Sequence, residues 1–145
     1  FKGMRKKPEV MERVFWKLGD QILKYMELVK EYGGDLISYA DSSGGVNILG
    51  PKMMEAVTVN FTYPFLKKVE QLADDKTMIL LCPKTTLALI GTEKAKFVDH
   101  QLEEPIGYAQ ACIHMIGKAH FAGQMCIKNV GYQLNHGIFK EVKLL

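Results

Sequence analysis

The sequence has few cysteines and no long apolar run, and these two absences exclude whole classes of protein. Its three cysteines, Cys82, Cys112 and Cys126, are odd in number and far apart. They do not suggest the disulfide framework of a small secreted domain, and they suit a reducing compartment. The longest apolar stretches, such as residues 78–82, are far shorter than the ~20 residues needed to span a bilayer, and no signal peptide precedes them. We therefore expect a cytoplasmic protein with no membrane partner.

The chain also lacks a strong charge of either sign. It contains 19 basic and 16 acidic residues, which gives a net charge of +3. The basic residues cluster only near the first residue, at Lys2, Arg5, Lys6 and Lys7. Such a short terminal cluster is usually solvated, so we expect no nucleic-acid partner.

Apolar residues, by contrast, are abundant enough for one packed domain. They make up 48% of the 145 residues, and their spacing alternates between a helical period and short continuous runs typical of buried strands. The predicted elements are helix 8–33, strand 35–41, a helical stretch 51–72 broken near Pro64, strand 77–82, a short helix capped by Thr85 or Thr86 and ending at Gly91, strand 95–99, helix 105–116, strand 120–126 and a terminal helix 137–145. Strands that alternate with helices predict an α/β fold with about four parallel strands.

Polar residues follow the predicted strands. Asp41, Ser42 and Ser43 follow the first strand, Lys84 the second and Gln124 the fourth. The carboxyl ends of parallel strands meet at one rim, where ligands bind in such folds. Together with the start of a helix, which attracts anions, these residues are candidates for binding a polar or anionic substrate. A turn built by the aspartate without any ligand explains residues 41–43 equally well.

Cys82, His100 and Cys126 also fall at predicted strand ends on this rim. Thiolate and imidazole are the ligands that zinc prefers, and a catalytic zinc uses three protein ligands, so these residues are a candidate zinc site. The alternative is that the cysteines are small core residues, because no close pair of metal ligands occurs in the sequence. Cys112 lies within a predicted helix and is read as a core residue, and the other three histidines are read as structural or surface residues.

Several segments carry a pattern that periodicity does not explain. They are Lys7–Met11, Gly34–Gly45, Pro51, Tyr63–Lys68, Ile79–Thr86 and Gly123–Cys126. In order and spacing they resemble motifs of the uroporphyrinogen decarboxylase superfamily: a proline before a helix, a Gly-Ala-Asp strand with an Asp-Ser turn, a Pro-Tyr-x-Lys segment and a Gly-Asn-x-Asp turn. The stretch Ile79–Thr86 is similar to the His-x-Cys-Gly-x-Thr-Thr stretch of the methylcobalamin:coenzyme M methyltransferase branch. The resemblance covers nearly the whole chain.

This resemblance implies that residues 1–145 form a partial domain, the C-terminal half of a (β/α)8 barrel. It implies a corrinoid-dependent methyltransferase, in which a methylcobalamin-like corrinoid donates a methyl group to a thiol or similar acceptor, and zinc activates that acceptor. Cys82 matches the family's zinc-binding cysteine, whereas Leu80 stands where the family has a histidine. Zinc binding would therefore need Cys126 or His100 as a substitute. The Asp-Ser turn would contact a substrate carboxylate.

Two other functions within the superfamily remain open. One is a decarboxylase-like lyase of tetrapyrrole metabolism, although Arg5 and Arg13 are the only arginines available to grip carboxylates. The other is an inactive scaffold that binds a corrinoid or a partner protein.

The expected partners follow from the size of the domain. They are a corrinoid protein or tetrapyrrole-like ligand, and either a second copy of the chain or a separate N-terminal half, because a full barrel takes about 250 residues. The first residue is Phe1 rather than methionine, so we expect an upstream portion to be missing, and we do not expect this segment to be active alone.

Overall fold

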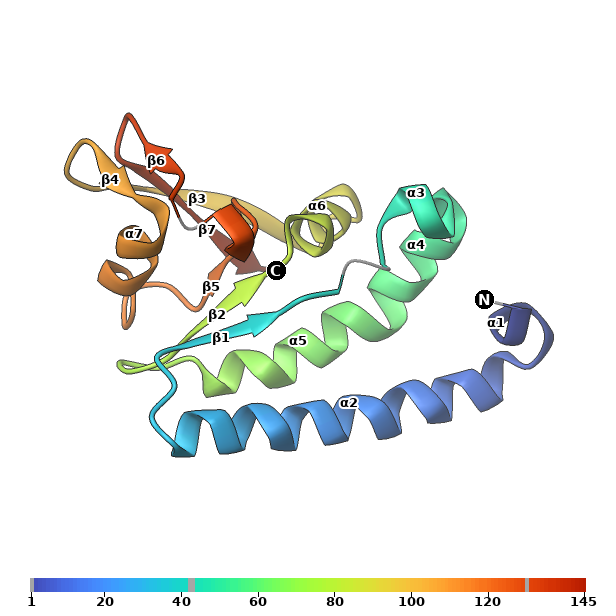
Figure 1. The fold of residues 1–145 in the computed structure, drawn as a ribbon. Helices are drawn as coiled ribbons and strands as arrows, with labels where there is room; N and C mark the ends of the chain where they lie inside the picture. The colour runs from blue at the N-terminus through green and yellow to red at the C-terminus, as the bar shows by residue number, and fades with distance from the viewer. Residues whose placement is uncertain (1, 42–43, 130) are drawn as a thin grey trace.

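The computed structural model describes residues 2–41, 44–129 and 131–145, which form an α/β fold of three layers (Figure 1). In this part of the chain a five-stranded sheet lies between two layers, and a smaller two-stranded sheet belongs to one of them. The helical elements are α1 (Lys2–Lys6), α2 (Pro8–Glu31), α3 (Val46–Leu49), α4 (Pro51–Val57), the π-helical turn η1 (Thr58–Thr62), α5 (Tyr63–Val69), the 3₁₀ turn η2 (Glu70–Leu72), α6 (Pro83–Gly91), α7 (Tyr108–His114) and the 3₁₀ turn η3 (Ile127–Asn129). The strands are β1 (Leu36–Tyr39), β2 (Met78–Leu81), β3 (Ala95–Gln101), β4 (Ile106–Gly107), β5 (Phe121–Ala122), β6 (Gln133–Leu134) and β7 (Ile138–Leu144).

Helix α2 confirms the first predicted helix. Pro8 occupies its first turn, where the missing N–H is harmless. The chain leaves the helix at Gly33, whose φ of 85° lies in the left-handed region that glycine adopts most easily. In the described part of the chain, no helix combines the length and the apolar content needed to cross a membrane.

The predicted interruption near Pro64 takes the form of a π-helical turn. The N–H of Tyr63 donates to the carbonyl of Thr58, five residues earlier, and α5 then continues from Tyr63. A proline inside a helix removes one hydrogen bond and crowds the preceding turn. The wider π turn accommodates Pro64 while the helical path from α4 to α5 continues.

The large sheet has the spatial order β1-β2-β5-β7-β3. Strands β1, β2 and β5 are parallel, as predicted, whereas β7 is antiparallel to both of its neighbours. All four residues of β2 are buried, which confirms a strand covered on both faces. The α/β class is therefore confirmed, but the sheet is mixed rather than wholly parallel.

The prediction of a terminal helix over residues 137–145 is wrong. Residues 138–144 form β7, which pairs along its whole length with β3. Phe139 is buried on one face of the sheet, and Val142 and Leu144 are buried on the other, so both faces of β7 bear apolar side chains. Strand β3 still points the same way as β5, but β7 lies between them, so β3 does not occupy the place expected from consecutive strand-helix units.

Two smaller boundaries also differ from the predictions. The helix expected from Pro105 begins only at Tyr108, because Ile106 and Gly107 pair with β6. The strand expected over residues 120–126 is reduced to Phe121 and Ala122.

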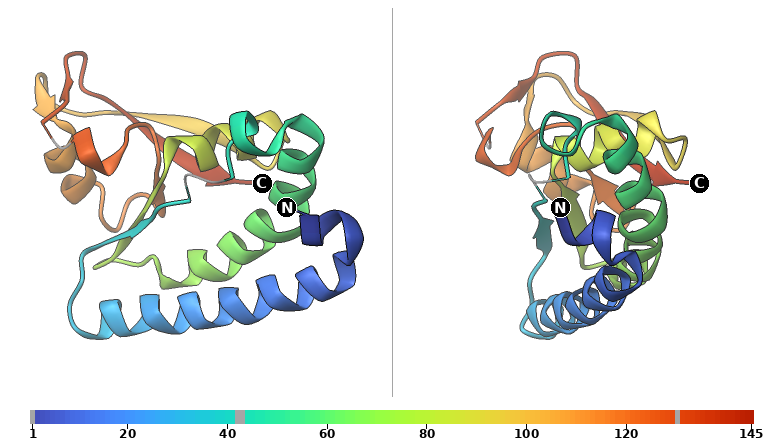
Figure 2. Two further views of the ribbon diagram at one scale, coloured as in Figure 1. Left: turned by 45° about the vertical axis from the view of Figure 1, so that its right-hand side comes forward. Right: turned by 90° about the vertical axis from the view of Figure 1, so that its right-hand side faces the viewer.

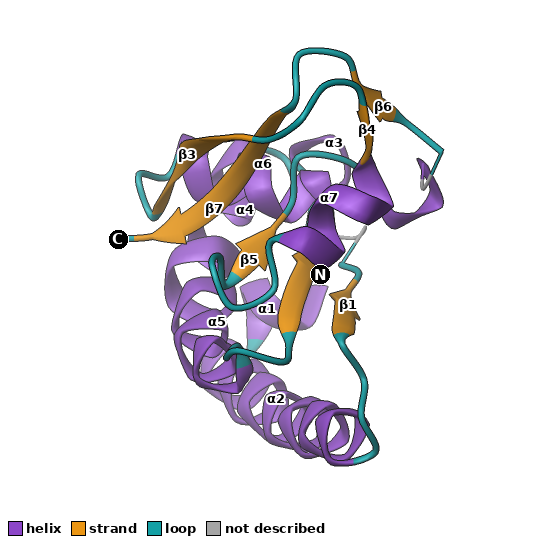
Figure 3. Cartoon of the chain, turned by 90° about the vertical axis from the view of Figure 1, so that its left-hand side faces the viewer, coloured by secondary structure: helices purple, strands orange, loops and turns teal. Residues whose placement is uncertain are grey.

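Each face of the large sheet has its own apolar core. Helices α2, α5 and α6 cover one face and α7 the other, so that α5 and α7 lie on opposite sides of the strands (Figure 3). The first core contains Met26, Ile37, Phe65, Leu66, Val69, Ile79, Leu81, Leu89, Ala95, Phe121, Val142 and Leu144. The second contains Met78, Leu80, Tyr108, Ala111, Cys112, Met115, Ala119, Ala122, Leu134 and Phe139.

A pair of leucines tests the first core. Leu66 is fully buried on α5, whereas Leu87 on α6 is 65% exposed. We expect Leu66→Ala to lower the free energy of unfolding by about 3 kcal/mol, since it leaves a cavity, and Leu87→Ala to change it by less than about 0.5 kcal/mol. Urea denaturation followed by circular dichroism measures both values. Equal effects of the two substitutions would contradict this packing.

Candidate functional site

Three predicted site residues meet at one edge of the large sheet. Asp41 follows β1, Cys82 follows β2 and Gln124 follows β5. Because the three strands are parallel and in register, their carboxyl ends lie side by side. We call this edge the strand-end rim.

Asp41 organises the turn after β1. Its Oδ1 accepts a hydrogen bond from the N–H of Gly44 at 3.0 Å, and its carbonyl oxygen accepts one from the Thr85 hydroxyl at 3.4 Å. A Cβ at Gly44 would lie 2.9 Å from the Asp41 carboxylate, so a larger residue there would have to displace that carboxylate. Ser42 and Ser43, also predicted to bind substrate, lie outside the described residues. The first of these two hydrogen bonds stabilises the turn after β1, and the second connects β1 to the start of α6.

The segment after β2 begins helix α6. Cys82 is the N-cap residue, half-buried, and its carbonyl accepts the N–H of Thr86 at 3.0 Å. Thr85 and Thr86 are buried inside the first turn, so the prediction that one of them caps the helix is wrong. Lys84 is exposed, and a Cβ at Gly45 would lie 3.3 Å from its Cδ, which places the lysine stem beside the loop that follows Asp41.

Gln124 is held by the backbone of β7. Its Nε2 donates to the carbonyl of Ile138 at 3.3 Å, and its Oε1 accepts the N–H of Lys140 at 3.0 Å. A ligand at this amide would compete with both bonds. Gly123, just before it, lies so close to α6 that a Cβ there would overlap the Thr86 hydroxyl.

The three candidate zinc ligands are not gathered into one group. His100 lies on β3, where its Nε2 is 2.8 Å from Oε2 of Glu141, and Cys126 lies half-buried in the loop before η3. Following the register across β2, β5, β7 and β3 puts His100 three strands from Cys82, about 14 Å at ~4.8 Å per strand. Among residues 2–41, 44–129 and 131–145, no three His, Cys, Asp or Glu side chains are placed to hold a metal ion. Zinc binding by Cys82, His100 and Cys126 stays a prediction.

The remaining cysteine is a core residue, as predicted. Cys112 lies on α7, on the side that faces the sheet, and is 1% exposed. Burial raises the pKa of its thiol to about 11.

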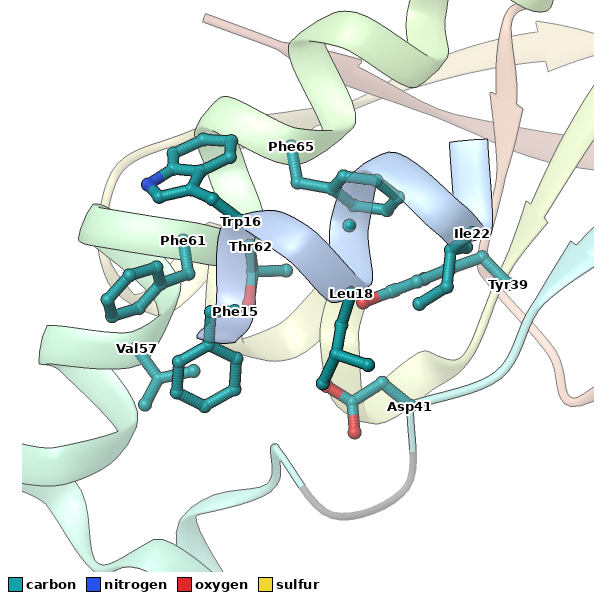
Figure 4. A pocket seen from close by; sticks show the side chains of 11 residues that line it. Phe15, Trp16, Leu18, Ile22, Tyr39, Asp41, Val57, Phe61, Thr62 and Phe65 are labelled. Atoms are coloured by element: carbon teal, nitrogen blue, oxygen red, sulfur yellow. The ribbon is translucent and has the colours of Figure 1, made fainter. Parts of the chain in front are cut away.

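A small aromatic cavity opens beside Asp41, between α2, β1 and the α4–α5 helical segment (Figure 4). Its volume is about 200 Å³, and a cavity of about 150 Å³ already holds benzene. It therefore fits a small apolar group. The lining residues are Phe15, Trp16, Leu18, Gly19, Ile22, Tyr39, Asp41, Val57, Phe61, Thr62 and Phe65.

Ring contacts hold the walls of this cavity together. The centroids of Phe15 and Phe61 are 4.7 Å apart, and those of Tyr39 and Phe65 are 5.6 Å apart. The ammonium of Lys68 lies 4.5 Å from the centre of the Trp16 ring, within the range of a cation–π interaction. These contacts join α2 to the η1–α5 segment and β1 to α5.

Tyr39 lines the cavity, and the pKa of its phenol is raised. Burial, followed by the negative charge of Asp41, raises the pKa of its phenol from 10.0 to about 12. At neutral pH the phenol is therefore a hydrogen-bond donor close to a carboxylate.

The sequence patterns do not predict this cavity. Phe61 and Phe65 are four residues apart and so share one face of a helix, which is the signal that was available. Their meeting with Phe15 and Trp16 depends on how α2 packs, which periodicity does not determine.

Searches against models of protein families, curated proteins and solved structures found no match to this chain. The site is therefore described by its own residues alone. Membership of the uroporphyrinogen decarboxylase superfamily stays an expectation that follows from the sequence motifs.

The three thiols should react at different rates. At pH 8 a thiol with a pKa of about 11 is about one-thousandth thiolate, and Cys112 is also shielded from solvent. We expect iodoacetamide to modify the half-buried Cys82 and Cys126 first, and Cys112 only slowly, with a rate that increases as the pH rises toward 11. Peptide mass spectrometry measures the three rates. In urea all three should react alike; rapid labelling of Cys112 in the folded protein would contradict its burial.

Titration of Tyr39 tests its proximity to Asp41. In Asp41→Asn the negative charge is lost, so the pKa of Tyr39 should fall below about 12, yet stay above 10.0 because burial is the larger cause. Tyrosinate absorbance, recorded as a difference from Tyr39→Phe, isolates this group. Asp99→Asn removes an exposed carboxylate on β3 and serves as the control. An unchanged Tyr39 titration in Asp41→Asn would show that the two groups do not interact.

Proposed function

We propose that the chain is part of a corrinoid-dependent methyltransferase of the uroporphyrinogen decarboxylase superfamily, and that the strand-end rim faces the corrinoid. The observation that supports this is the parallel pairing of β1, β2 and β5. Two of the segments that resemble the superfamily, Gly34–Gly45 and Ile79–Thr86, include the carboxyl ends of β1 and β2, and a third, Gly123–Cys126, directly follows β5. Two of them touch directly, because Thr85 donates to the carbonyl of Asp41.

The open edge of β1 agrees with the idea that the chain is half of a (β/α)8 barrel. The carbonyl of Asp35 accepts a hydrogen bond from the N–H of Met78 on β2, and the carbonyl of Tyr39 accepts one from the N–H of Cys82, just past the end of β2. Alternation along the strand then turns the backbone groups of Leu36, Ser38 and Ala40 toward the open side. A preceding parallel strand, from a separate N-terminal half, would pair there.

The rim suits a large ligand better than the aromatic cavity does. A corrinoid ring system far exceeds a volume of about 200 Å³, so it would lie across the strand ends, with Lys84 near its phosphate. The cavity beside Asp41 fits only a small group.

This proposal assigns no role to zinc. Cys82, His100 and Cys126 do not form a ligand set in the described part of the chain, so zinc binding by them stays a prediction. The proposal rests on corrinoid binding alone.

The lyase alternative has less support. A porphyrinogen with many carboxylates is best held by guanidinium groups. Arg5 and Arg13 are the only arginines in the sequence, and they lie on α1 and α2 rather than on the strand-end rim.

Binding of methylcobalamin tests the proposal, with two exposed lysines at opposite ends of β2 as a matched pair. Lys84 follows β2 at the rim, and Lys76 precedes it at the other edge. Loss of one exposed ion pair to the corrinoid phosphate should weaken binding by about fivefold in Lys84→Ala, and Lys76→Ala should have no effect. Absorbance titration of the purified chain gives the affinities.

The same titration with uroporphyrin separates the alternatives. Binding of uroporphyrin without methylcobalamin would favour the lyase. Binding of neither ligand, or equal losses in the two lysine variants, would reject a corrinoid site at this rim.

A further inference from the structure

Helix α2 carries a long row of exposed apolar side chains. Its inner face packs through Met26 and Leu23 into the first core. In Figures 1 and 2 it forms one long side of the molecule, and no other described element covers its outer side. The exposed row consists of Val10, Val14, Leu18, Ile22, Tyr25, Leu28 and, just past the end of the helix, Tyr32, with exposed fractions from 36% to 87%. We call this row the outer stripe. Contiguous apolar surface of this kind marks an interaction site.

A row of charged residues borders the outer stripe on one side. Its members are all exposed and follow one another at intervals of three or four residues, the spacing of neighbours along a helix. They are Arg13, Lys17, Asp20, Lys24, Glu27 and Glu31. The row is mainly basic toward the start of α2 and acidic at its end. Within the described part of the chain, only Asp20 among them forms an ion pair, with Lys68 at a distance of 3.9 Å.

We propose that the outer stripe binds a second copy of this chain, with the two α2 helices antiparallel across a two-fold axis near Ile22. Because this axis is perpendicular to both helices, the charged row of one copy lies beside the same row of the other copy. The two rows run in opposite directions. Residue numbers that face each other then sum to about 44. Arg13 meets the partner's Glu31, Lys17 the partner's Glu27, and Asp20 the partner's Lys24.

Every one of these pairs joins opposite charges, which is why the second copy is the partner that this surface fits. Charges at the border of a helix pair set register and orientation, as in coiled coils. Exposed ion pairs are individually weak, so the affinity comes from burial of the outer stripe. The charges select the antiparallel arrangement.

Charge reversal tests the pairing. We expect the full chain to sediment as a dimer at micromolar concentration. Lys17→Glu and Glu27→Lys each create two repulsive pairs across the axis, and each should weaken the dimer about tenfold at low salt. The double variant K17E/E27K should restore it, and so should a mixture of the two single variants, which re-forms both pairs. Lys96→Glu, at an exposed position on β3, should leave the dimer unchanged.

The oligomeric states of the chain and of its charge-reversal variants decide whether the proposal holds. A monomer at micromolar concentration would overturn it and would leave the outer stripe to a different protein. A dimer that ignores the single reversals, or single variants that stay folded by circular dichroism but are not rescued by mixing, would overturn the antiparallel arrangement. Since sedimentation needs no corrinoid, failure here is distinct from failure of the proposed function.

Discussion

The fold depends on the complete burial of one short strand. Met78 and Leu80 of β2 belong to the core under α7, whereas Ile79 and Leu81 belong to the core under the other helices. Since successive side chains point to opposite faces, a strand with four apolar residues in a row must be covered on both. β2 also pairs in parallel with a strand on each side, so it fixes the direction of its neighbours as well as the two helical layers.

The same pairing creates the strand-end rim. Parallel strands require crossover connections, and here the crossovers after β1 and β2 begin with the Asp41 turn and with α6. The rim is firm because its polar groups are used structurally: the Thr85 hydroxyl binds the carbonyl of Asp41, and the Gln124 amide bridges to β7. Because these polar groups are already hydrogen-bonded within the protein, the rim keeps its shape without a ligand. For the same reason, fewer polar groups remain to bind one.

Local patterns in the sequence predicted most of the elements but not their spatial order. The 3.6-residue period identifies α2, and the apolar run of β2 is identified as a strand because it is too short for a helix. The last segment differs: Ile138, Phe139, Val142 and Leu145 would share one face of a helix, whereas the observed strand buries Phe139, Val142 and Leu144 on its two faces. Pairing with β3 decides between the two, and no local pattern contains that information. The expectation that His100 lies on the rim has the same origin. Its strand was predicted correctly, but the sequence did not predict that β7 lies between β5 and β3.

Helix α2 connects the aromatic cavity to the outer stripe. Leu18 and Ile22 line the cavity, yet they are 54% and 42% exposed and belong to the outer stripe as well. Any protein that covers α2 therefore also covers part of the cavity wall and removes water from the surroundings of Tyr39 and Asp41. Interactions between charged and polar groups strengthen as water is excluded. The chemistry available beside Asp41 is thus coupled, through two leucine-sized side chains, to whatever occupies the outer face of α2.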